Sequence, residues 1–171
     1  MSVWKLAGSG LILASSFWAG RRAADRLRSD KRALHELRGA LEQMAGEIAF
    51  AAPPFASLCR RAGQGREATT ARYFALLAEE AERPGFLPEG CSARAAAGSG
   101  LRLPRDAESA LERLFDGFGQ FDRETQLRRI GLTAETLQRC ENALEAELEG
   151  RCRCLELLGL SAGAALLLVV I

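Results

Sequence analysis

The stretch that most clearly predicts structure is Leu34-His-Glu-Leu-Arg-Gly-Ala-Leu-Glu-Gln-Met-Ala-Gly-Glu-Ile48. Its large apolar residues recur at spacings of three, four, three and four, which is an apolar seam of the heptad type. Such a seam lies on one face of an α-helix and packs against another helix. Pro53-Pro54 ends the predicted helix, because proline lacks a backbone N–H and clashes with the preceding turn.

Glycines and prolines divide the chain that follows into further predicted helices. Strand signals are nearly absent, whereas Ala, Leu, Glu and Arg, all strong helix formers, dominate. We expect helices over residues 54–62, 67–82, 89–97 and 105–116, and a long helix from about residue 122 toward the C-terminus. Its buried stripe is expected at Leu127, Ile130, Ala134, Leu137, Leu144 and Leu148.

Both ends of the chain are apolar. Residues 3–20 contain one charged residue, Lys5, and residues 157–171 contain none. At 1.5 Å per residue, the first run covers roughly 27 Å, and the second, taken from residue 155, roughly 22 to 25 Å of a hydrocarbon core about 30 Å thick. Local thinning of the bilayer accommodates spans that are a few ångströms too short, at a modest cost in free energy. The predicted domains are therefore a transmembrane helix over 1–20, a helical domain over 21–154 and a second transmembrane helix over 155–171.

Residues that flank the first apolar run support its assignment as a membrane span and predict its orientation. Trp4 and Trp18 lie near its opposite ends, where indoles prefer the headgroup zone. Arg21 and Arg22 begin a basic cluster just past the apolar run, and such clusters tend to remain in the cytoplasm. The alternative is a cleaved secretory signal, but basic residues that follow the apolar run favour an uncleaved anchor. For the C-terminal run, the alternative is a buried helix of a soluble core.

The fold class predicted is all-α, a helical bundle of about six helices between an N-terminal and a C-terminal transmembrane helix. The first and last long helices should pair antiparallel, because both are tied to one face of the membrane. Gly159 and Gly163 form a small-xxx-small pattern that would let the spans, or a homo-oligomer, pack closely. Chance is the alternative, since glycine is common in membrane spans.

Composition argues against several classes of function. A net charge of +1 and an aromatic content of 6% give no reason to expect nucleic acid as a partner. No phosphate-binding loop, nucleophile with its base, or metal cluster is visible, so we predict no catalytic residue, no cofactor and no metal. Cys152-Arg-Cys154 admits a metal site as an alternative, but the one histidine, His35, lies on a different predicted helix. Free thiols are expected.

The most distinctive short stretch is Phe118-Gly-Gln-Phe-Asp-Arg-Glu-Thr-Gln126. Gly119 suits the left-handed residue that closes a helix, and Asp122 suits the N-cap of the next. That structural explanation accounts for most of the stretch. A functional explanation keeps Arg123 and Gln126 as exposed contacts for a partner. The candidate partner-contact motif is therefore Gly119, Asp122, Arg123 and Gln126.

Taken together, these features resemble the stage III sporulation protein AB family of endospore-forming bacteria. The resemblance rests on the first span with its arginines, the 34–48 seam, Pro53-Pro-Phe-Ala-Ser-Leu58, the turn and helix from Gly119 to Ile130, and the C-terminal span, in the same order. Two points depart from the family. Phe121 stands where a small residue is usual, and the alanine-rich segment 89–98 is less amphipathic than the family's helix.

The resemblance implies a fold similar to the cytoplasmic domain of the type II secretion inner-membrane platform protein. It also implies a non-enzymatic scaffold in the mother-cell membrane around the forespore, with its helical domain in the cytoplasm. The scaffold would belong to the secretion-like channel complex between the two compartments, which supports late forespore gene expression. Expected partners are the membrane proteins of that complex, a secretion-type ATPase and the lipid bilayer. The alternatives are a membrane-tethered regulator or enzyme without a recognisable active site, and a self-assembling protein that shapes the membrane.

Overall fold

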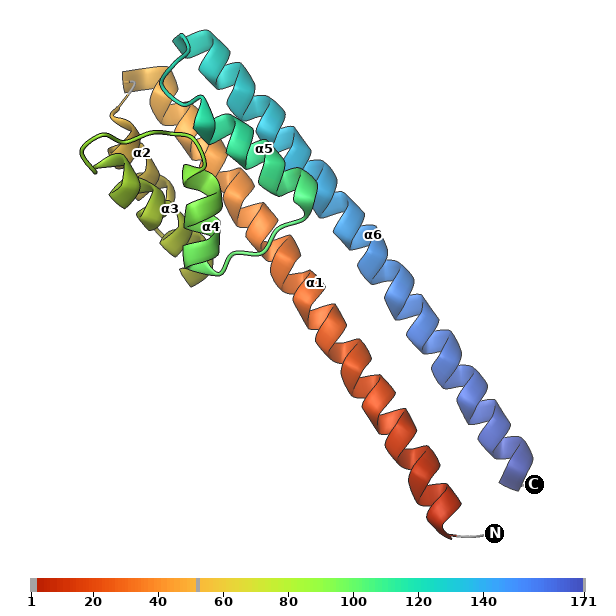
Figure 1. The fold of residues 1–171 in the computed structure, drawn as a ribbon. Helices are drawn as coiled ribbons and strands as arrows, with labels where there is room; N and C mark the ends of the chain where they lie inside the picture. The colour runs from red at the N-terminus through yellow and green to blue at the C-terminus, as the bar shows by residue number, and fades with distance from the viewer. Residues whose placement is uncertain (1–2, 52, 171) are drawn as a thin grey trace. The chain divides into compact units, whose positions relative to one another are not determined.

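The computed structural model describes the backbone of residues 3–51 and 53–170, and the side chains of residues 25, 27–51, 53–148 and 150. Six α-helices follow one another, and no strand occurs in the described backbone (Figure 1). They are α1 (Val3–Ala51), α2 (Phe55–Ala62), α3 (Ala68–Ala81), α4 (Cys91–Ser99), α5 (Arg105–Asp116) and α6 (Arg123–Val170). The predicted all-α fold with about six helices is confirmed.

The chain divides into two compact units, Asp30–Ala143 and Met1–Ser29 with Leu144–Ile171. The first unit is called the body below. Among the described residues, no helix offers a stretch both long and apolar enough to cross a bilayer. The predicted spans, 1–20 and 155–171, lie outside the residues whose side chains are described. The spans and the predicted domain boundaries therefore stay predictions.

The apolar seam of α1 forms the centre of the body. Leu34, Leu37, Leu41 and Met44 are fully buried, and Ile48 is 4% exposed. Removing a leucine or methionine side chain from water contributes roughly 1.5 to 3 kcal/mol. The prediction from the heptad spacing is confirmed at every one of its five positions.

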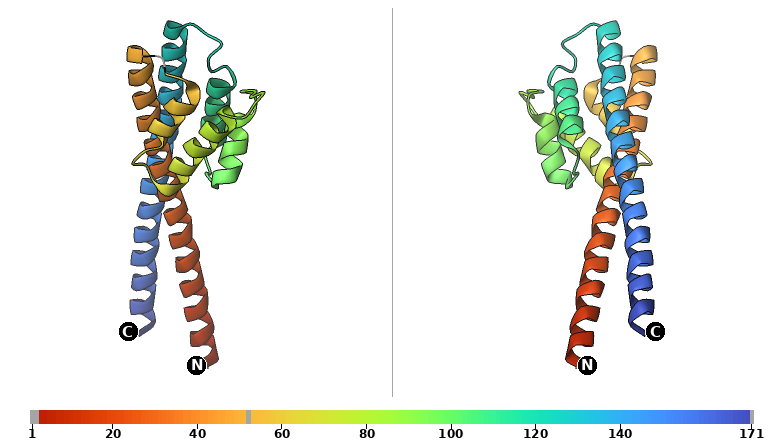
Figure 2. Two further views of the ribbon diagram at one scale, coloured as in Figure 1. Left: turned by 90° about the vertical axis from the view of Figure 1, so that its left-hand side faces the viewer. Right: turned by 90° about the vertical axis from the view of Figure 1, so that its right-hand side faces the viewer.

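Within the body, α1 and α6 run antiparallel, and the shorter helices lie to one side of this pair (Figures 1 and 2). His35 Nδ1 lies 3.3 Å from Glu141 Oε1, which fixes the register of the two helices. The buried stripe of α6 differs in part from the prediction. Ile130 and Leu137 are buried, but Leu127 and Ala134 are half-buried, and Thr133 is buried instead. Thr133 lies on the side of α6 that faces α5, an arrangement that the periodicity of α6 alone does not show.

Glycines set the ends of α4, where the prediction of residues 89–97 was wrong by two residues. Gly90 precedes the helix with a φ of +69°, and Gly100 follows it with a φ of +73°. Both values lie in the left-handed region, which glycine enters without steric cost. The helix consequently begins one residue after Gly90 and continues through Gly98 to Ser99.

The alanine-rich sequence of α4 allows it to approach α3 closely. Ala95 is 1% exposed, and a Cβ added to Gly98 would lie 2.9 Å from Leu76 Cδ1. Tyr73 of α3 and Ser92 of α4 join by a buried hydrogen bond of 2.7 Å between their hydroxyl oxygens. Small side chains on α4 therefore provide tight packing where a strongly amphipathic pattern is missing.

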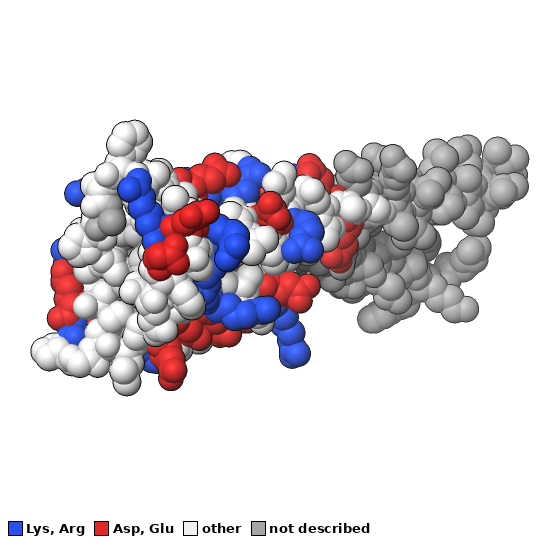
Figure 3. Space-filling model, turned by 90° about the horizontal axis from the view of Figure 1, so that it is seen from above, with Lys and Arg blue, Asp and Glu red and all other residues white. Residues whose placement is uncertain are grey.

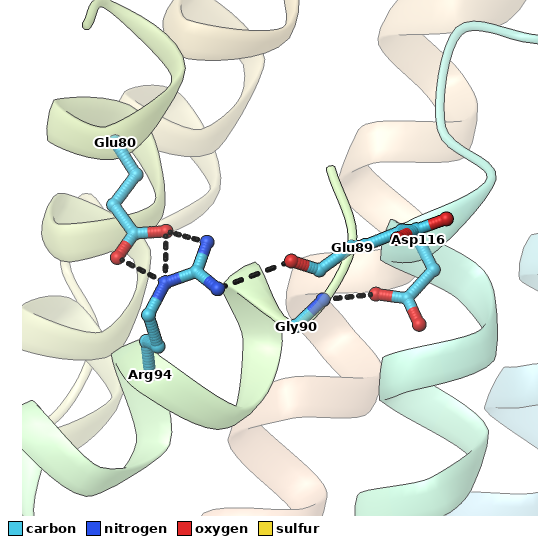
Figure 4. A network of polar contacts seen from close by, with 5 residues as sticks. All are labelled: Glu80, Glu89, Gly90, Arg94 and Asp116. Carbon is cyan, nitrogen blue, oxygen red and sulfur yellow. Dashed lines mark hydrogen bonds and ion pairs between the residues drawn. The ribbon is translucent and has the colours of Figure 1, made fainter. Parts of the chain in front are cut away.

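Polar contacts tie the start of α4 to both of its neighbours (Figure 4). Arg94 donates from Nη2 and Nε to the carboxylate of Glu80 on α3, at 2.8 to 3.2 Å, and from Nη1 to the carbonyl oxygen of Glu89 at 3.1 Å. Asp116, the last residue of α5, accepts from the N–H of Gly90 at 2.9 Å. A carboxylate at a helix N-terminus also opposes the positive end of the helix dipole. α3, α4 and α5 are thus fixed to one another.

An aromatic cluster fills the space among α2, α3 and the two longest turns of the body. Phe55 lies 4.5 Å from Phe118, 5.9 Å from Phe115 and 6.0 Å from Phe86, measured between ring centroids. Tyr73 extends the cluster through an edge-to-face contact of 6.4 Å with Phe115. Such pairs contribute about 0.5 to 1.5 kcal/mol beyond the area they bury. The cluster holds the turn after α5 against α2.

Candidate partner-binding site

The turn between α5 and α6 contains the motif that stands out in the sequence. The chain turns through residues 117–122, where the N–H of Gln120 donates to the carbonyl oxygen of Gly117 at 3.3 Å. Gly119 adopts a φ of +82°, as its predicted left-handed conformation requires, and nothing lies within 4 Å of an added Cβ. It does so in the middle of the turn, however, and Gly117 occupies the C-cap of α5. The predicted role of Gly119 in closing that helix was therefore wrong, because the helix ends at Asp116, three residues earlier.

Asp122 is the N-cap of α6. Its Oδ2 accepts from the N–H of Thr125 at 3.1 Å, and its carbonyl oxygen accepts from the N–H of Gln126 at 3.0 Å. Hydrogen bonds from the side chain and backbone of Thr125 lower the pKa of the Asp122 carboxyl below its ordinary value. Arg123 is exposed beside it, and Gln126 is half-buried. The motif thus leaves Arg123 accessible to a partner, while its role in binding stays a prediction.

Phe121 and Arg129 form a contact that the sequence did not reveal. The guanidinium carbon of Arg129 lies 4.5 Å from the centroid of the Phe121 ring, a cation–π arrangement. Arg129 Nη2 also donates to the carbonyl oxygen of Arg113 on α5. Phe121 remains 45% exposed. The arginine therefore links the turn, α5 and α6 at the surface.

Gly117 provides the space for this arrangement. A Cβ added there would overlap Arg129 Nη1 and lie 2.8 Å from Phe121 Cε2. Gly117 and Gly119 lie two residues apart in the sequence. No sequence pattern shows that side chains approach Gly117 closely while Gly119 adopts the left-handed conformation. The close approach at Gly117 is the feature that sequence reasoning missed.

The other predicted site residues lie outside the residues whose side chains the structure describes. They are the membrane-flanking Trp4, Trp18, Arg21 and Arg22, and the span-packing Gly159 and Gly163. Their proposed roles stay predictions.

Three thiols lie in the body, and all three are free. Burial raises the pKa of the Cys91 thiol to about 11, and it raises the pKa of the Cys59 thiol further. Cys140 is half-buried, and desolvation also raises its pKa. All three are therefore protonated and poorly nucleophilic at neutral pH. Cys152 and Cys154 lie outside the described side chains, and within the described ones no group of three or more metal-ligating residues occurs.

Charge on the body is mixed in sign. Figure 3 shows Lys and Arg side chains interleaved with Asp and Glu over the face seen from above. Several of these charges pair between helices, as Arg61 does with Glu47 at 3.3 Å. Exposed pairs of this kind contribute little to stability. The arrangement suits a surface that binds protein rather than one that follows a polyanion.

Comparison with known proteins decides the family. The family profile described as stage III sporulation protein AB matches residues 5–171 of the 171-residue chain. The chain belongs to the stage III sporulation protein AB family. Phe121 and segment 89–98, which the resemblance singled out as departures, fall inside the match. Local packing accommodates both, because Arg129 covers the Phe121 ring and the small residues of α4 pack closely against α3.

A solved structure described as stage III sporulation protein AB (SpoIIIAB) has the same fold. It superposes with a TM-score of 0.64 and 17% sequence identity, over 71% of this chain and 97% of that chain. No curated protein matches the chain. Membership of the stage III sporulation protein AB family supports a role in stage III of sporulation.

Proposed function

We propose that the chain is a non-enzymatic inner-membrane scaffold of the secretion-like channel complex between mother cell and forespore. Its two terminal segments would anchor it in the mother-cell membrane around the forespore, with the body in the cytoplasm. The membrane proteins of the same complex and a secretion-type ATPase would be its partners. A fold like that of the type II secretion platform protein is part of the proposal.

The family match carries this proposal. It extends over all but the first four residues and so includes both apolar ends together with the body. A match of this extent supports assigning one function to the apolar ends and the helical body together. The body supports the proposal in a second way, because its helices are fixed to one another by a continuous core and by the Arg94, Glu80 and Asp116 contacts.

Affinity purification of the tagged full chain tests the proposal. The tagged chain would be extracted in mild detergent from cells at stage III. We expect the secretion-type ATPase and other membrane proteins of the channel complex to co-purify. An unrelated tagged membrane protein, extracted in the same way, is the matched control for nonspecific membrane proteins. Purification of the chain alone, under conditions that keep the other components associated with each other, would contradict the scaffold proposal.

A further inference from the structure

A groove runs between α5 and α6 on the body. It encloses about 630 Å³ and is lined on α6 by residues at helical spacing from Arg129 to Ala143. At 1.5 Å per residue, this face is roughly 21 Å long, which is about four helical turns. A groove of this shape between two helices is suited to a third helix.

The lining of the groove is mixed, and its apolar part includes one leucine from each helix. Leu114 of α5 is 3% exposed at the floor, and Leu132 of α6 is 58% exposed. The hydroxyls of Thr133 and Thr136 donate to the carbonyl oxygens of Arg129 and Leu132, at 3.0 and 2.9 Å. Because both hydroxyls are satisfied within α6, neither threonine needs a polar partner from the groove. An apolar side chain of a partner would therefore complete the packing around the exposed leucine.

Three arginines surround this apolar strip: Arg113, Arg129 and Arg139. Their side chains donate to neutral oxygens, namely those of Ser109, Arg113 and Thr136. Within the described part of the chain, none of them has a carboxylate at ion-pair distance. Elsewhere on the body, Arg94 pairs with Glu80 and Arg61 with Glu47.

Asp106 is the acidic residue of the lining, and it forms no ion pair with these arginines among the described side chains. Three arginines and one aspartate give the groove a formal charge of +2. A guanidinium has five N–H donors, so each arginine keeps capacity for a carboxylate. The groove therefore combines an apolar strip with unpaired positive charge at both ends of that strip.

We propose that the α5–α6 groove docks an acidic amphipathic helix of a partner protein. The helix would place small or aliphatic residues against Leu132 and Leu114, with Glu or Asp on its flanks facing the three arginines. The proposal deepens the scaffold function and rests on it for the partner's place in the complex. A second copy of this chain fits less well, because a two-fold contact through the groove would set arginine against arginine. The acidic residues near the end of α3 are also poor candidates to fill the groove of a second copy, because Glu80 and Glu82 already pair with Arg94 and Arg60.

Peptide binding to the full chain in detergent micelles tests the chemistry. The probe is a labelled amphipathic peptide of about 18 residues, long enough to span the groove, with a leucine stripe flanked by glutamates. Its matched control replaces each glutamate with glutamine. Arg139→Glu and Leu132→Asp alter exposed side chains of the groove. Arg128→Glu and Leu87→Asp are the controls, because Arg128 is exposed on the same helix outside the groove and Leu87 is 73% exposed in a distant loop.

We expect the glutamate peptide to bind at least about tenfold more tightly than the glutamine peptide, and either groove substitution to weaken it by about tenfold. The control substitutions should change binding less than about twofold. Equal binding of the two peptides, or equal losses in the groove and control variants, would overturn the proposal.

Photocrosslinking in sporulating cells identifies the occupant. A photoreactive amino acid at position 132 should crosslink to an acidic, amphipathic segment of another protein, and the same group at position 128 should not. An adduct that consists of two copies of this chain would overturn the partner assignment. Suppose that deletion of the gene blocks sporulation, but that groove variants sporulate normally and position 132 gives no crosslink. In that case only the groove proposal fails. If deletion has no effect, the scaffold function fails instead.

Discussion

The guanidinium of Arg129 covers the ring of Phe121, with 4.5 Å between the guanidinium carbon and the ring centroid. The same arginine donates to the carbonyl oxygen of Arg113 and occupies the space left by Gly117. Phe121, a large aromatic residue in the turn, thereby positions Arg129 at one end of the α5–α6 groove. The turn at Phe121 and the proposed docking surface are thus physically connected.

Replacing Phe121 with alanine should destabilise the body by about 1 kcal/mol, because the cation–π contact and part of the ring's burial are lost. Thermal unfolding of the full chain in detergent micelles measures the change. Phe50→Ala is the control, since Phe50 is 93% exposed and its removal should change stability by less than about 0.5 kcal/mol. Equal effects of the two substitutions would show that the Phe121–Arg129 contact contributes nothing.

Gly117 and Gly119 should respond differently to substitution. Gly117→Ala should cost about 1 to 3 kcal/mol by displacing Arg129 and Phe121, and adding Arg129→Ala together with Phe121→Ala should remove most of that penalty. Gly119→Ala should cost about 1 to 2 kcal/mol through backbone strain, and Gly119→Asn less, because asparagine tolerates the left-handed region better. Unfolding measurements on this set distinguish the two causes. A penalty at Gly117 that persists when both the Arg129 and the Phe121 side chains are removed would contradict the steric explanation.

Asp122 should make stability depend on pH in the acid range. Its pKa is lowered in the folded chain, so its contribution is present above the unfolded value of about 4 and is lost as pH falls through the folded value. Asp122→Ala should therefore destabilise the chain at neutral pH, and the difference from the native chain should shrink as the pH falls below about 4. Asp122→Asn should keep most of the cap, because its side-chain oxygen still accepts from Thr125. A difference that stays constant down to about pH 2 would contradict this account.

The Tyr73–Ser92 hydrogen bond should show strong coupling in a double-mutant cycle. Tyr73→Phe leaves the buried Ser92 hydroxyl without its partner and should cost about 1 to 3 kcal/mol. The double variant Tyr73→Phe with Ser92→Ala removes both polar groups and should be more stable than Tyr73→Phe alone. Additive losses would indicate that the hydroxyls act independently.

Thiol accessibility should report the side of the membrane on which the body lies. Cys59 is unsuitable as a reporter, because it is fully buried and would escape reagents on either side. A single cysteine introduced by Arg128→Cys in a chain without other cysteines would be exposed, because Arg128 is. In vegetative cells that carry the chain in their outer cell membrane, we expect a membrane-impermeant maleimide to label it only after the cells are permeabilised. Labelling in intact cells would place the body outside the cytoplasm.

Periodicity and chain-breaking residues were sufficient to predict most of the fold. The seam from Leu34 to Ile48 was predictable because its repeat reports one buried helix face, and the start of α5 was predictable because Pro104 precedes it. Phe55, Phe86 and Phe118 were not assigned to a cluster, because residues at helix starts and in turns have no periodicity. Their burial depends on which distant segments meet.

The candidate site was less predictable for a related reason. Asp122 could be assigned to an N-cap because capping is local in sequence. The contact between Phe121 and Arg129, and the groove beside it, depend on how α5 packs against α6. Leu132 is exposed and Thr133 buried for that reason, which reverses what their hydrophobicity suggests. Sequence reasoning therefore located the turn but not the surface beside it.

Expression of late forespore genes tests the central claim of a sporulation scaffold most directly. A fluorescent reporter of a late forespore promoter would be followed in a strain that lacks the gene, with the full chain or an empty vector supplied in trans. The account predicts that the reporter stays off in the deletion strain after engulfment and is restored by the full chain. Normal reporter activity in the deletion strain would contradict it.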